Sequence, residues 1–241
     1  YIDRVVLDEA DEMLSMGFKD DLDLILSKTS DQKQVLLFSA TMGKKILSIT
    51  KKYMNNPIKI ASSEINSSTK QVDHYYYMVQ AKHRYEVIKR IADMNPDIYG
   101  IVFCRTRRET KEVANKLMND HYNADTIHGD LTQSERDDVM GRFRKRQLQI
   151  LVATDVAARG LDVDDLTHVI NYNLPDDDEI YIHRSGRTGR AGKQGISMVI
   201  IHGRELRKLK GIEKNSGIFF TKKNVPNGID ICKKRFYTLI D

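Results

Sequence analysis

The feature that most constrains the fold is an alternation between short apolar runs and longer amphipathic stretches. Near-continuous apolar runs occur at residues 5–7, 35–38, 101–103, 150–153, 169–170 and 197–201. Runs of this length with little polar alternation are typical of strands buried on both faces of a parallel sheet. Helical patterns lie between them, so the sequence predicts an α/β architecture with right-handed crossovers.

Two of the predicted helices carry a start signal. One begins at Thr106 and the other at Thr132, and each has a glutamate three residues later, Glu109 and Glu135. This spacing predicts capping boxes, in which the hydroxyl and the carboxylate accept hydrogen bonds from amides that the first helical turn leaves unpaired.

A polar, Ser/Thr-rich segment at residues 61–71 (ASSEINSSTKQ) indicates a linker between two units. Residues 72–203 hold enough strands for a complete domain. Residues 1–60 hold about three strands and two helices, which are too few for one. Residues 204–241 carry ten Lys and Arg against four acids and form a basic extension, which is typical of a polyanion partner or of a solvated helix face.

Composition excludes several classes of protein. Hydrophobic residues make up 40% and charged residues 30%, and no apolar run approaches the ~18 residues of a membrane span. The two cysteines, Cys104 and Cys232, form neither a disulfide framework nor a zinc spacing, and they fit a reducing, cytoplasmic compartment. Cys104 lies in an apolar run, so we expect it to be a small buried residue. His128 and His183 have no second ligand at zinc spacing, which disfavours metal ligation by them.

Acidic residues follow the first apolar run. In open α/β sheets, ligands bind at the carboxyl ends of strands. Of the acids Asp8, Glu9 and Asp11 there, one carboxylate can hold Mg²⁺ through its waters, and a second beside it can orient and deprotonate a water. These acids suit the N-terminus of a helix equally well. Ser39 and Thr41 end the next run and either bridge this site to a neighbour or form a turn.

The segment at residues 183–190, HRSGRTGR, is the most specific in the chain. It begins at His183 and places three arginines beside two glycines, which allow a ligand to approach the backbone closely. Guanidinium forks suit phosphate oxygens, and an arginine at a γ-phosphate stabilises transition-state charge. The arginines of this segment are therefore expected to contact phosphate, since a basic surface loop needs no glycines at fixed spacing.

Other polar groups also follow buried runs. In the segment at residues 154–162, Thr154 and the backbone amides can hold a phosphate, and Asp162 can accept from a ribose hydroxyl. The alternative is an ordinary turn capped by Asp155. Tyrosines 75–77 suggest base stacking, but three in a row are more often strand residues. The remaining residues of this kind are Thr106, His128, Gly129, Asp130, Gln133 and Arg136.

In this combination and order the motifs resemble those of DEAD-box RNA helicases of superfamily 2, in the style of the bacterial members. The matching segments are residues 8–11 (DEAD), 39–41 (SAT), 102–106 (VFCRT), 128–136 (HGDLTQSER), 154–162 (TDVAARGLD) and 183–190 (HRSGRTGR).

The resemblance implies two RecA-like lobes that close over ATP and single-stranded RNA. It assigns residues 1–60 to the C-terminal part of the first lobe and residues 72–203 to the second. By position, Asp8 would serve Mg²⁺ and Glu9 would activate the attacking water. Further roles follow in the same way. Arg187 and Arg190 would be arginine fingers, and His183 would couple to the acidic motif. Ser39 and Thr41 would link ATP hydrolysis to RNA binding. The residues that would serve nucleotide coupling are Asp11, Gly160 and Asp162, and Asp162 would contact the ribose.

The implied partner is RNA, as single strands or duplex ends. Backbone contacts of this kind carry little sequence information, so base preference should be weak. No membrane partner is expected, and protein partners are not specified. The residues placed on RNA phosphates and sugars are Thr106, Gly129, Gln133, Arg136 and Thr154.

One family motif is missing. The phosphate-binding P-loop, G-x-x-x-x-G-K-[ST], does not occur: Gly192-Lys193 is followed by Gln194, and Arg187 stands where the first glycine would be. In the family this motif lies upstream of the acidic motif, so we expect the chain to begin late in the first lobe. We therefore expect this chain alone to bind ATP poorly and to hydrolyse almost none.

The function predicted for the parent protein is that of an ATP-dependent RNA helicase, with ATP and Mg²⁺ as cofactors. Two alternatives stay open. The first is a non-catalytic RNA-binding or regulatory module, which the missing P-loop favours. The second is a DNA-translocating relative, which would share the two-lobed ATPase core. Restoring upstream sequence tests the first alternative, and competition between RNA and DNA strands tests the second.

Overall fold

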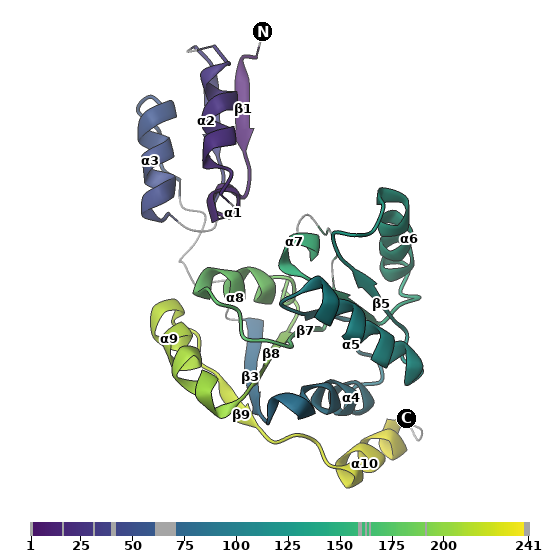
Figure 1. Ribbon diagram of the computed structural model, residues 1–241. Coiled ribbons are helices and arrows are strands. Elements are labelled where there is room, and N and C mark those ends of the chain that lie inside the picture. Colours follow the sequence, from purple (N-terminus) through teal and green to yellow (C-terminus); the bar gives the residue numbers. More distant parts are fainter. Residues whose placement is uncertain are drawn as a thin grey trace. The chain divides into compact units, whose positions relative to one another are not determined.

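The computed structural model describes residues 2–15, 17–30, 32–39, 42–60, 71–158, 161, 163, 165–190 and 192–238. The chain divides into two compact units, residues 1–62 and residues 63–241. Figure 1 shows the elements of each in sequence colours. The expected linker at residues 61–71 lies almost wholly outside the described residues.

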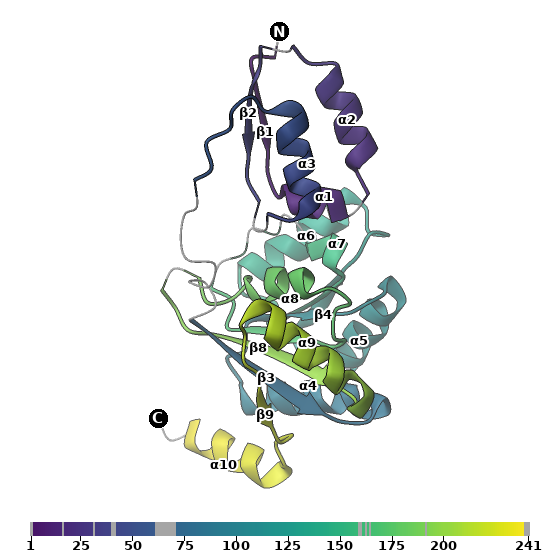
Figure 2. The same ribbon diagram turned by 90° about the vertical axis from the view of Figure 1, so that its left-hand side faces the viewer.

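The first unit is a two-stranded parallel sheet with helices on one side (Figure 2). Its elements are β1 (Arg4–Leu7), α1 (Ala10–Ser15), α2 (Lys19–Ser27), β2 (Gln34–Leu37) and α3 (Lys44–Tyr53). Leu7 lies opposite Leu37 in the register. Alternate strand residues pack with Leu26 and Ile49 of the helices, while Val6 and Leu36 on the other face are exposed.

The first unit differs from its sequence expectation in one respect. Its described residues form two strands and three helices, not three strands and two helices. The apolar residues Ile58 and Ile60, which follow α3, are exposed and belong to no strand. Pro57 precedes them and cannot donate to a sheet ladder, which disfavours a strand at this point.

The second unit is built on a seven-stranded, wholly parallel sheet in the order β5-β6-β4-β7-β8-β3-β9. All the carboxyl ends of these strands therefore lie at one edge. The strands are β3 (Val72–Met78), β4 (Gly100–Phe103), β5 (Ala124–Ile127), β6 (Ile150–Ala153), β7 (His168–Asn171), β8 (Gly195–Ile201) and β9 (Thr221–Lys223). The helices are α4 (Arg84–Met94), α5 (Arg107–Asn119), α6 (Gln133–Arg144), α7 (Asp155–Ala158), α8 (Asp178–Ser185), α9 (Leu206–Ser216) and α10 (Gly228–Thr238), with short 3₁₀ turns at Ala81–His83 and Gly203–Glu205.

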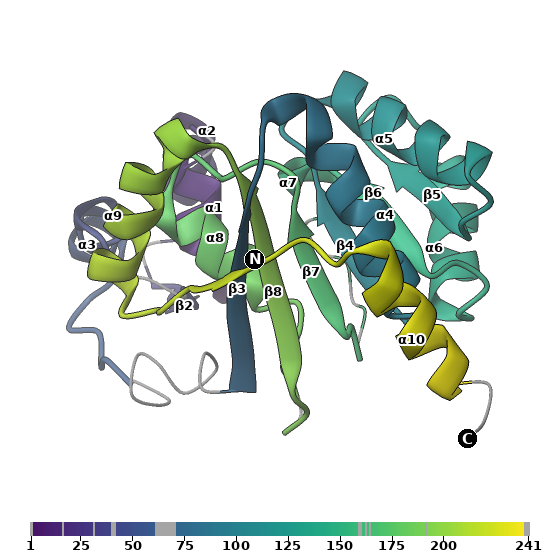
Figure 3. The same cartoon turned by 90° about the horizontal axis from the view of Figure 1, so that it is seen from below.

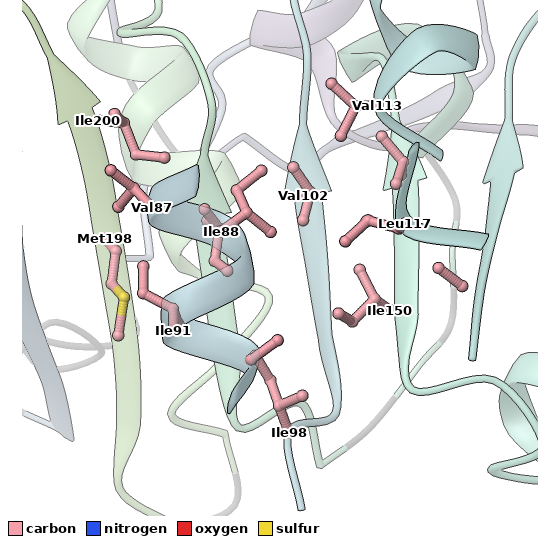
Figure 4. Packing of buried hydrophobic residues seen from close by; sticks show 14 of the residues in the cluster. Val87, Ile88, Ile91, Ile98, Val102, Val113, Leu117, Ile150, Met198 and Ile200 are labelled. Atoms are coloured by element: carbon pink, nitrogen blue, oxygen red, sulfur yellow. The ribbon is translucent and has the colours of Figure 1, made fainter. Parts of the chain in front are cut away.

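Helices cover both faces of this sheet. Val102 of β4 packs with Ile88 of α4 and Leu117 of α5 on one face (Figure 4). Its neighbour Ile101 packs with Phe143 of α6 on the other. Because strand side chains alternate between faces, two-sided burial requires the apolar runs seen in the sequence. The predicted α/β fold is confirmed.

The two predicted capping boxes differ in outcome. At α6 the box is complete: the Thr132 hydroxyl accepts from the Glu135 amide at 3.3 Å, and the Glu135 carboxylate accepts from the Thr132 amide at 2.8 Å. At α5 the Thr106 hydroxyl accepts from the Glu109 amide at 3.2 Å. The Glu109 carboxylate, however, accepts from the Arg105 amide and from Asn173, each at 3.1 Å. The predicted return bond to Thr106 is therefore wrong, because Asn173, which follows the neighbouring strand β7, helps to draw the carboxylate away.

The compact unit continues beyond residue 203, where the sequence suggested a boundary. Leu209 and Ile212 of α9 are buried with Val199 of β8. Strand β9 then pairs in parallel with β3 and forms an edge of the sheet. The last helix, α10, packs beside α4 (Figure 3).

Candidate nucleotide and nucleic-acid sites

An acidic turn follows β1 in the first unit. Asp8 and Glu9 are both exposed, and the Asp8 carboxylate accepts from the Glu9 amide at 2.9 Å. Glu9 has φ +49°, a left-handed conformation that costs a non-glycine residue about 1–2 kcal/mol. Such strain concentrates at functional sites. The turn thus holds two exposed carboxylates where β1 ends.

The loop after β2 lies beside this turn. The Phe38 amide donates to the Leu7 carbonyl at 2.7 Å, and the Ala10 amide donates to the Phe38 carbonyl at 3.1 Å. Ser39 is half-buried and leaves the same sheet edge. Asp11 is buried, and its carboxylate accepts from the Glu12 amide at 3.1 Å. The predicted residue Thr41 lies outside the described residues.

Three neighbouring strands of the second unit lead into polar turns at one edge. Because β5, β6 and β4 are adjacent, the turns before α6, α7 and α5 come together. We call this group of turns the carboxyl-edge cluster. It holds five predicted residues, namely Thr106, Gly129, Gln133, Arg136 and Thr154. The N-termini of α5 and α6 lie in it, and helix N-termini favour anions because their first amides lack partners within the helix.

Side chains within the carboxyl-edge cluster tie its helices together. Arg136 of α6 donates from Nη2 to the Ala157 carbonyl of α7 at 2.6 Å. The Thr154 hydroxyl accepts from the Ala157 amide at 3.4 Å. Gln133 is exposed and donates to Asp137 one turn further along α6, at 2.8 Å. Thr154 and Arg136 therefore both bind the backbone of Ala157.

Two basic side chains in the same cluster were not singled out from the sequence. Arg107 donates to Asp130 at 2.7 Å, and Lys111 donates to the other oxygen of that carboxylate at 3.1 Å. Both bonds hold the pKa of Asp130 below its usual value. A Cβ at Gly129 would lie 3.4 Å from the Arg107 guanidinium, an ordinary van der Waals contact. The signal was the i, i+4 spacing of Arg107 and Lys111 just after the helix cap.

The arginine segment after α8 lies elsewhere on the second unit. A Cβ on Gly189 (φ +69°) would lie 2.5 Å from Cγ2 of Val72, at the start of β3. The segment is therefore near the amino ends of strands and is not part of the carboxyl-edge cluster. Arg187 is half-buried and donates to the Leu161 carbonyl at 3.3 Å. Arg190 is exposed and donates to the Gly186 carbonyl at 2.8 Å.

Arg184, one position after His183 on α8, forms a buried network that the sequence did not predict. It is 4% exposed, and its guanidinium donates to both oxygens of Asp155 at 2.5 and 2.8 Å. It also donates to the Asn171 side chain at 2.9 Å and to the Asn173 carbonyl at 3.2 Å. Asp155 therefore binds Arg184 and does not cap α7, a role that falls to Thr154. His183 itself is half-buried on the same helix.

Hard oxygen ligands suit Mg²⁺, and the exposed carboxylate of Asp8 is of that kind. In the described part of the chain, no group of three or more His, Cys, Asp and Glu side chains converges on one point. The predicted coupling residues Gly160 and Asp162 lie outside the described residues.

Two family models match the chain. The model "DEAD/DEAH box helicase" covers residues 1–49, and the model "Helicase conserved C-terminal domain" covers residues 83–192. The chain thus belongs to the DEAD-box ATP-dependent RNA helicase family. Within that family it is similar to bacterial CshA proteins: it is 45% identical over 217 residues to CshA of Bacillus cereus and 42% identical over 218 residues to CshA of Listeria monocytogenes.

These matches cover 89% and 90% of the chain but only 41% and 42% of the relatives, so the chain spans about two fifths of their length. Among solved structures, S. cerevisiae Dbp5 bound to RNA and ADP BeF3 matches with a TM-score of 0.85 and 28% identity, over 100% of this chain and 64% of that one. A DEAD box protein from Methanococcus jannaschii matches with a TM-score of 0.62 and 45% identity, over 91% and 59%. No described helix has the length and hydropathy to cross a membrane.

Proposed function

We propose that the chain supplies the water-activating acids, the arginine pair and part of the RNA-binding surface of an RNA-dependent ATPase that separates RNA strands locally. The observation that carries this proposal is the carboxyl-edge cluster, where two helix N-termini meet exposed basic side chains. An anionic backbone is the ligand this chemistry suits, and the yeast relative described above binds RNA.

On the nucleotide side, the first unit provides the acids. Asp8 would hold Mg²⁺ through its waters, and the bound ion would neutralise charge on the ATP phosphates. Glu9 would accept the proton of the attacking water, and the strained turn keeps its carboxylate at the end of β1. The remaining coupling roles fall to Asp11, Ser39, Thr41, Gly160 and Asp162.

Arg187 and Arg190 would stabilise the negative charge that develops on the transferred phosphoryl group. The glycines of their segment support this role, since Gly189 lets the chain pass close to Val72 where a side chain would collide. His183 would couple this segment to the acidic turn. Positioning of the reacting groups and stabilisation of the transition-state charge, not covalent chemistry, would supply most of the rate acceleration of ATP hydrolysis.

On the RNA side, Thr106, Gly129, Gln133, Arg136 and Thr154 would contact phosphates and sugars. Such contacts read the shape of the backbone, so we expect little base preference. Arg107 and Lys111 belong to the same surface. Each would exchange its bond to Asp130 for one to a phosphate, because the carboxylate is exposed and water can replace them.

Three further assignments belong to this proposal. Residues 1–60 are the C-terminal part of a first lobe, and residues 72–203 are a second lobe. Residues 204–241 are a basic extension, and its strand β9 pairs with β3 of the second lobe's sheet. The 241 residues contain no phosphate-binding P-loop, so the chain alone should bind ATP poorly and hydrolyse almost none.

The test measures the rate of ATP hydrolysis with and without single-stranded RNA. It compares this chain with an N-terminally extended version that carries a P-loop. We expect RNA-stimulated turnover only in the extended protein, and its loss in Glu9→Gln but not in Asp20→Asn, an exposed acid on α2. Measurable stimulated turnover by the 241-residue chain would refute the inactivity of the chain alone.

RNA binding is tested separately on the 241-residue chain by fluorescence anisotropy. Arg136→Ala should weaken binding, while the matched control Arg108→Ala should not, because the Arg108 side chain is 90% exposed and pairs with Glu112 on its own helix. If the extended protein binds RNA without turning over ATP, the non-catalytic RNA-binding module is the correct alternative.

A further inference from the structure

Three hydrogen bonds form a closed triangle between the start of α5 and the loop after β7. The Arg105 amide donates to the side-chain oxygen of Asn173 and to one oxygen of Glu109, each at 3.1 Å. The side-chain nitrogen of Asn173 donates to the other Glu109 oxygen, also at 3.1 Å. We call this arrangement the Asn173 triangle. Asn173 is 64 and 68 positions away from its two partners, so no local sequence pattern predicts the contact.

The chemistry of the Asn173 triangle allows one arrangement of donors and acceptors. The backbone amide of Arg105 can only donate, and the ionised carboxylate of Glu109 can only accept. Asn173 therefore has to present its oxygen to the first and its nitrogen to the second. Because Asn173 is only 6% exposed, water cannot readily replace a partner that it loses, and a buried polar group without a partner is costly.

The loop that carries Asn173 is fixed independently of the triangle. Strands β4 and β7 pair with Phe103 opposite Asn171, and the Tyr172 amide then donates to the Phe103 carbonyl at 3.0 Å. On the other side, Arg184 of α8 donates to the Asn173 carbonyl at 3.2 Å. Asn173 is thus held by the sheet and by α8, and it supplies a fixed point for the start of α5.

The residue that the Asn173 triangle encloses is Thr106. Arg105 directly precedes Thr106, which is the N-cap of α5. Glu109 follows three positions later, and its amide donates to the Thr106 hydroxyl at 3.2 Å. The triangle therefore fixes the chain on both sides of Thr106, which is itself exposed in the carboxyl-edge cluster.

We propose that Asn173 and Glu109 are positioning residues of the RNA-binding surface, which hold Thr106 where its hydroxyl meets an RNA phosphate. The hydroxyl accepts from the Glu109 amide and can donate its own proton to a phosphate oxygen. Hydrogen bonds weaken steeply away from linear geometry, so a turn fixed at both ends favours that bond. The inference rests on the proposed function, because it takes RNA as the ligand of the carboxyl-edge cluster.

Two exchanges that preserve side-chain shape break the Asn173 triangle in opposite ways. Glu109→Gln places an NH₂ group against the NH₂ group of Asn173, and Asn173→Asp places carboxylate oxygens against each other. The double variant, Glu109→Gln with Asn173→Asp, again brings a donor to face an acceptor. It also carries the same net charge as the wild type.

The experiment measures binding of the 241-residue chain to a fluorescein-labelled oligouridylate by anisotropy. Each single variant should weaken binding about 2- to 10-fold, which corresponds to one hydrogen bond. The double variant should return to within about 2-fold of the wild type. The sign of the Glu109→Gln effect is decisive, because removal of a negative charge alone would strengthen binding to a polyanion. Stronger binding by Glu109→Gln would show that general charge explains the series, and it would overturn the inference.

A further comparison tests whether the triangle acts through Thr106. In a Thr106→Ala background the phosphate contact is already lost, so adding Asn173→Asp should weaken binding by at most about 2-fold more. An undiminished effect in that background would show that Asn173 acts elsewhere, and it would overturn the inference.

A matched control separates positioning from stability. Tyr122→Phe removes a half-buried hydroxyl that donates to Asp93 at 2.9 Å, beyond the C-terminal end of α5. It should lower the urea unfolding midpoint and leave the RNA affinity unchanged. If it weakens RNA binding as much as Asn173→Asp does, loss of stability explains both results and the positioning role is wrong.

The proposed function and this inference fail in different ways. If the wild type binds RNA and Arg136→Ala weakens binding, but the variants of the Asn173 triangle do not, only the inference is overturned. If the wild-type chain does not bind RNA, the proposed RNA surface fails and the inference fails with it.

Discussion

Replacing Arg184 should destabilise the second unit more than most single substitutions. Its guanidinium is buried and makes four hydrogen bonds, two to Asp155 and one each to Asn171 and Asn173. Arg184→Met fills similar volume but leaves the carboxylate and the buried amide oxygen of Asn171 without their donor. Removing one partner of a buried pair typically costs about 3–5 kcal/mol.

Cys104 offers an assay specific to this unit. It is fully buried at the end of β4, and burial raises the pKa of its thiol well above the usual value, so the native chain should not react there. Cys232 is exposed and labels at once. If labelling of Cys104 requires opening, Arg184→Met should speed it roughly 100- to 5,000-fold, which corresponds to the expected loss of stability.

Two variants test the reasoning about Arg184. Asp155→Asn should cost less than Arg184→Met, because the carboxamide oxygen still accepts from the guanidinium and Arg184 keeps its bonds to Asn171 and Asn173. The double variant should cost at least about 1 kcal/mol less than the sum of the two, because the residues share one interaction. Strict additivity, or an Arg184→Met chain that labels no faster than wild type, would refute the network's energetic role.

Three further predictions concern stability, each read from urea unfolding midpoints. Thr132→Ala removes the α6 cap and should cost about 1 kcal/mol; an unchanged midpoint would contradict the role of the capping box. Gly141→Ala lies inside α6 with nothing within 4 Å of the new Cβ and should gain about 0.5–1 kcal/mol, whereas Gly189→Ala should lose more than that, because its φ is +69° and its Cβ meets Val72; the same sign in both would be contrary to expectation. Burial lowers the pKa of His74 to about 4, so the unfolded chain takes up that proton first, and stability present above pH 6.5 is lost as the pH falls towards 4, by about 1–2 kcal/mol between pH 7 and pH 5. His74→Gln should flatten this loss, and an unaltered pH profile would exclude His74 as its source.

The central strands β4, β6, β7 and β8 were predictable because two-sided burial leaves them few polar positions. All six apolar runs of the sequence coincide with strands. The two edge strands of the seven-stranded sheet, and its inner strand β3, gave no such signal. β5 carries Asp125 and Thr126, and every residue of β9 is exposed, so neither strand has an apolar run to detect. Edge position depends on the sheet order, which local sequence does not encode.

Side-chain partners were less predictable than backbone elements. Asp155 and Glu109 both stand near helix starts, where local rules assign carboxylates to backbone amides. In the folded chain Arg184 donates to the Asp155 carboxylate, and Asn173 donates to the Glu109 carboxylate. Both donors come from distant sequence positions. The local rule held at Glu135, whose carboxylate accepts from the amide and the hydroxyl of Thr132 on its own helix. Short-range patterns thus identify the helix starts but not which acid caps them.

Helix α8 of the second unit contacts both the carboxyl-edge cluster and the arginine segment, the two surfaces that we propose to be functional. The carboxyl-edge cluster includes Thr154, and the arginine segment begins where α8 ends. Arg184 binds Asp155, the residue directly after Thr154, while Tyr181 one turn earlier on α8 shares hydrogen bonds with His74 at 2.6 Å and with a serine of β8 at 3.0 Å. A shift of α8 relative to the sheet would break the bonds of Tyr181 to His74 and Ser197, and it would either move α7 or break the bond between Arg184 and Asp155 as well. Rigid elements joined in this way are the means by which packed proteins transmit displacement between sites.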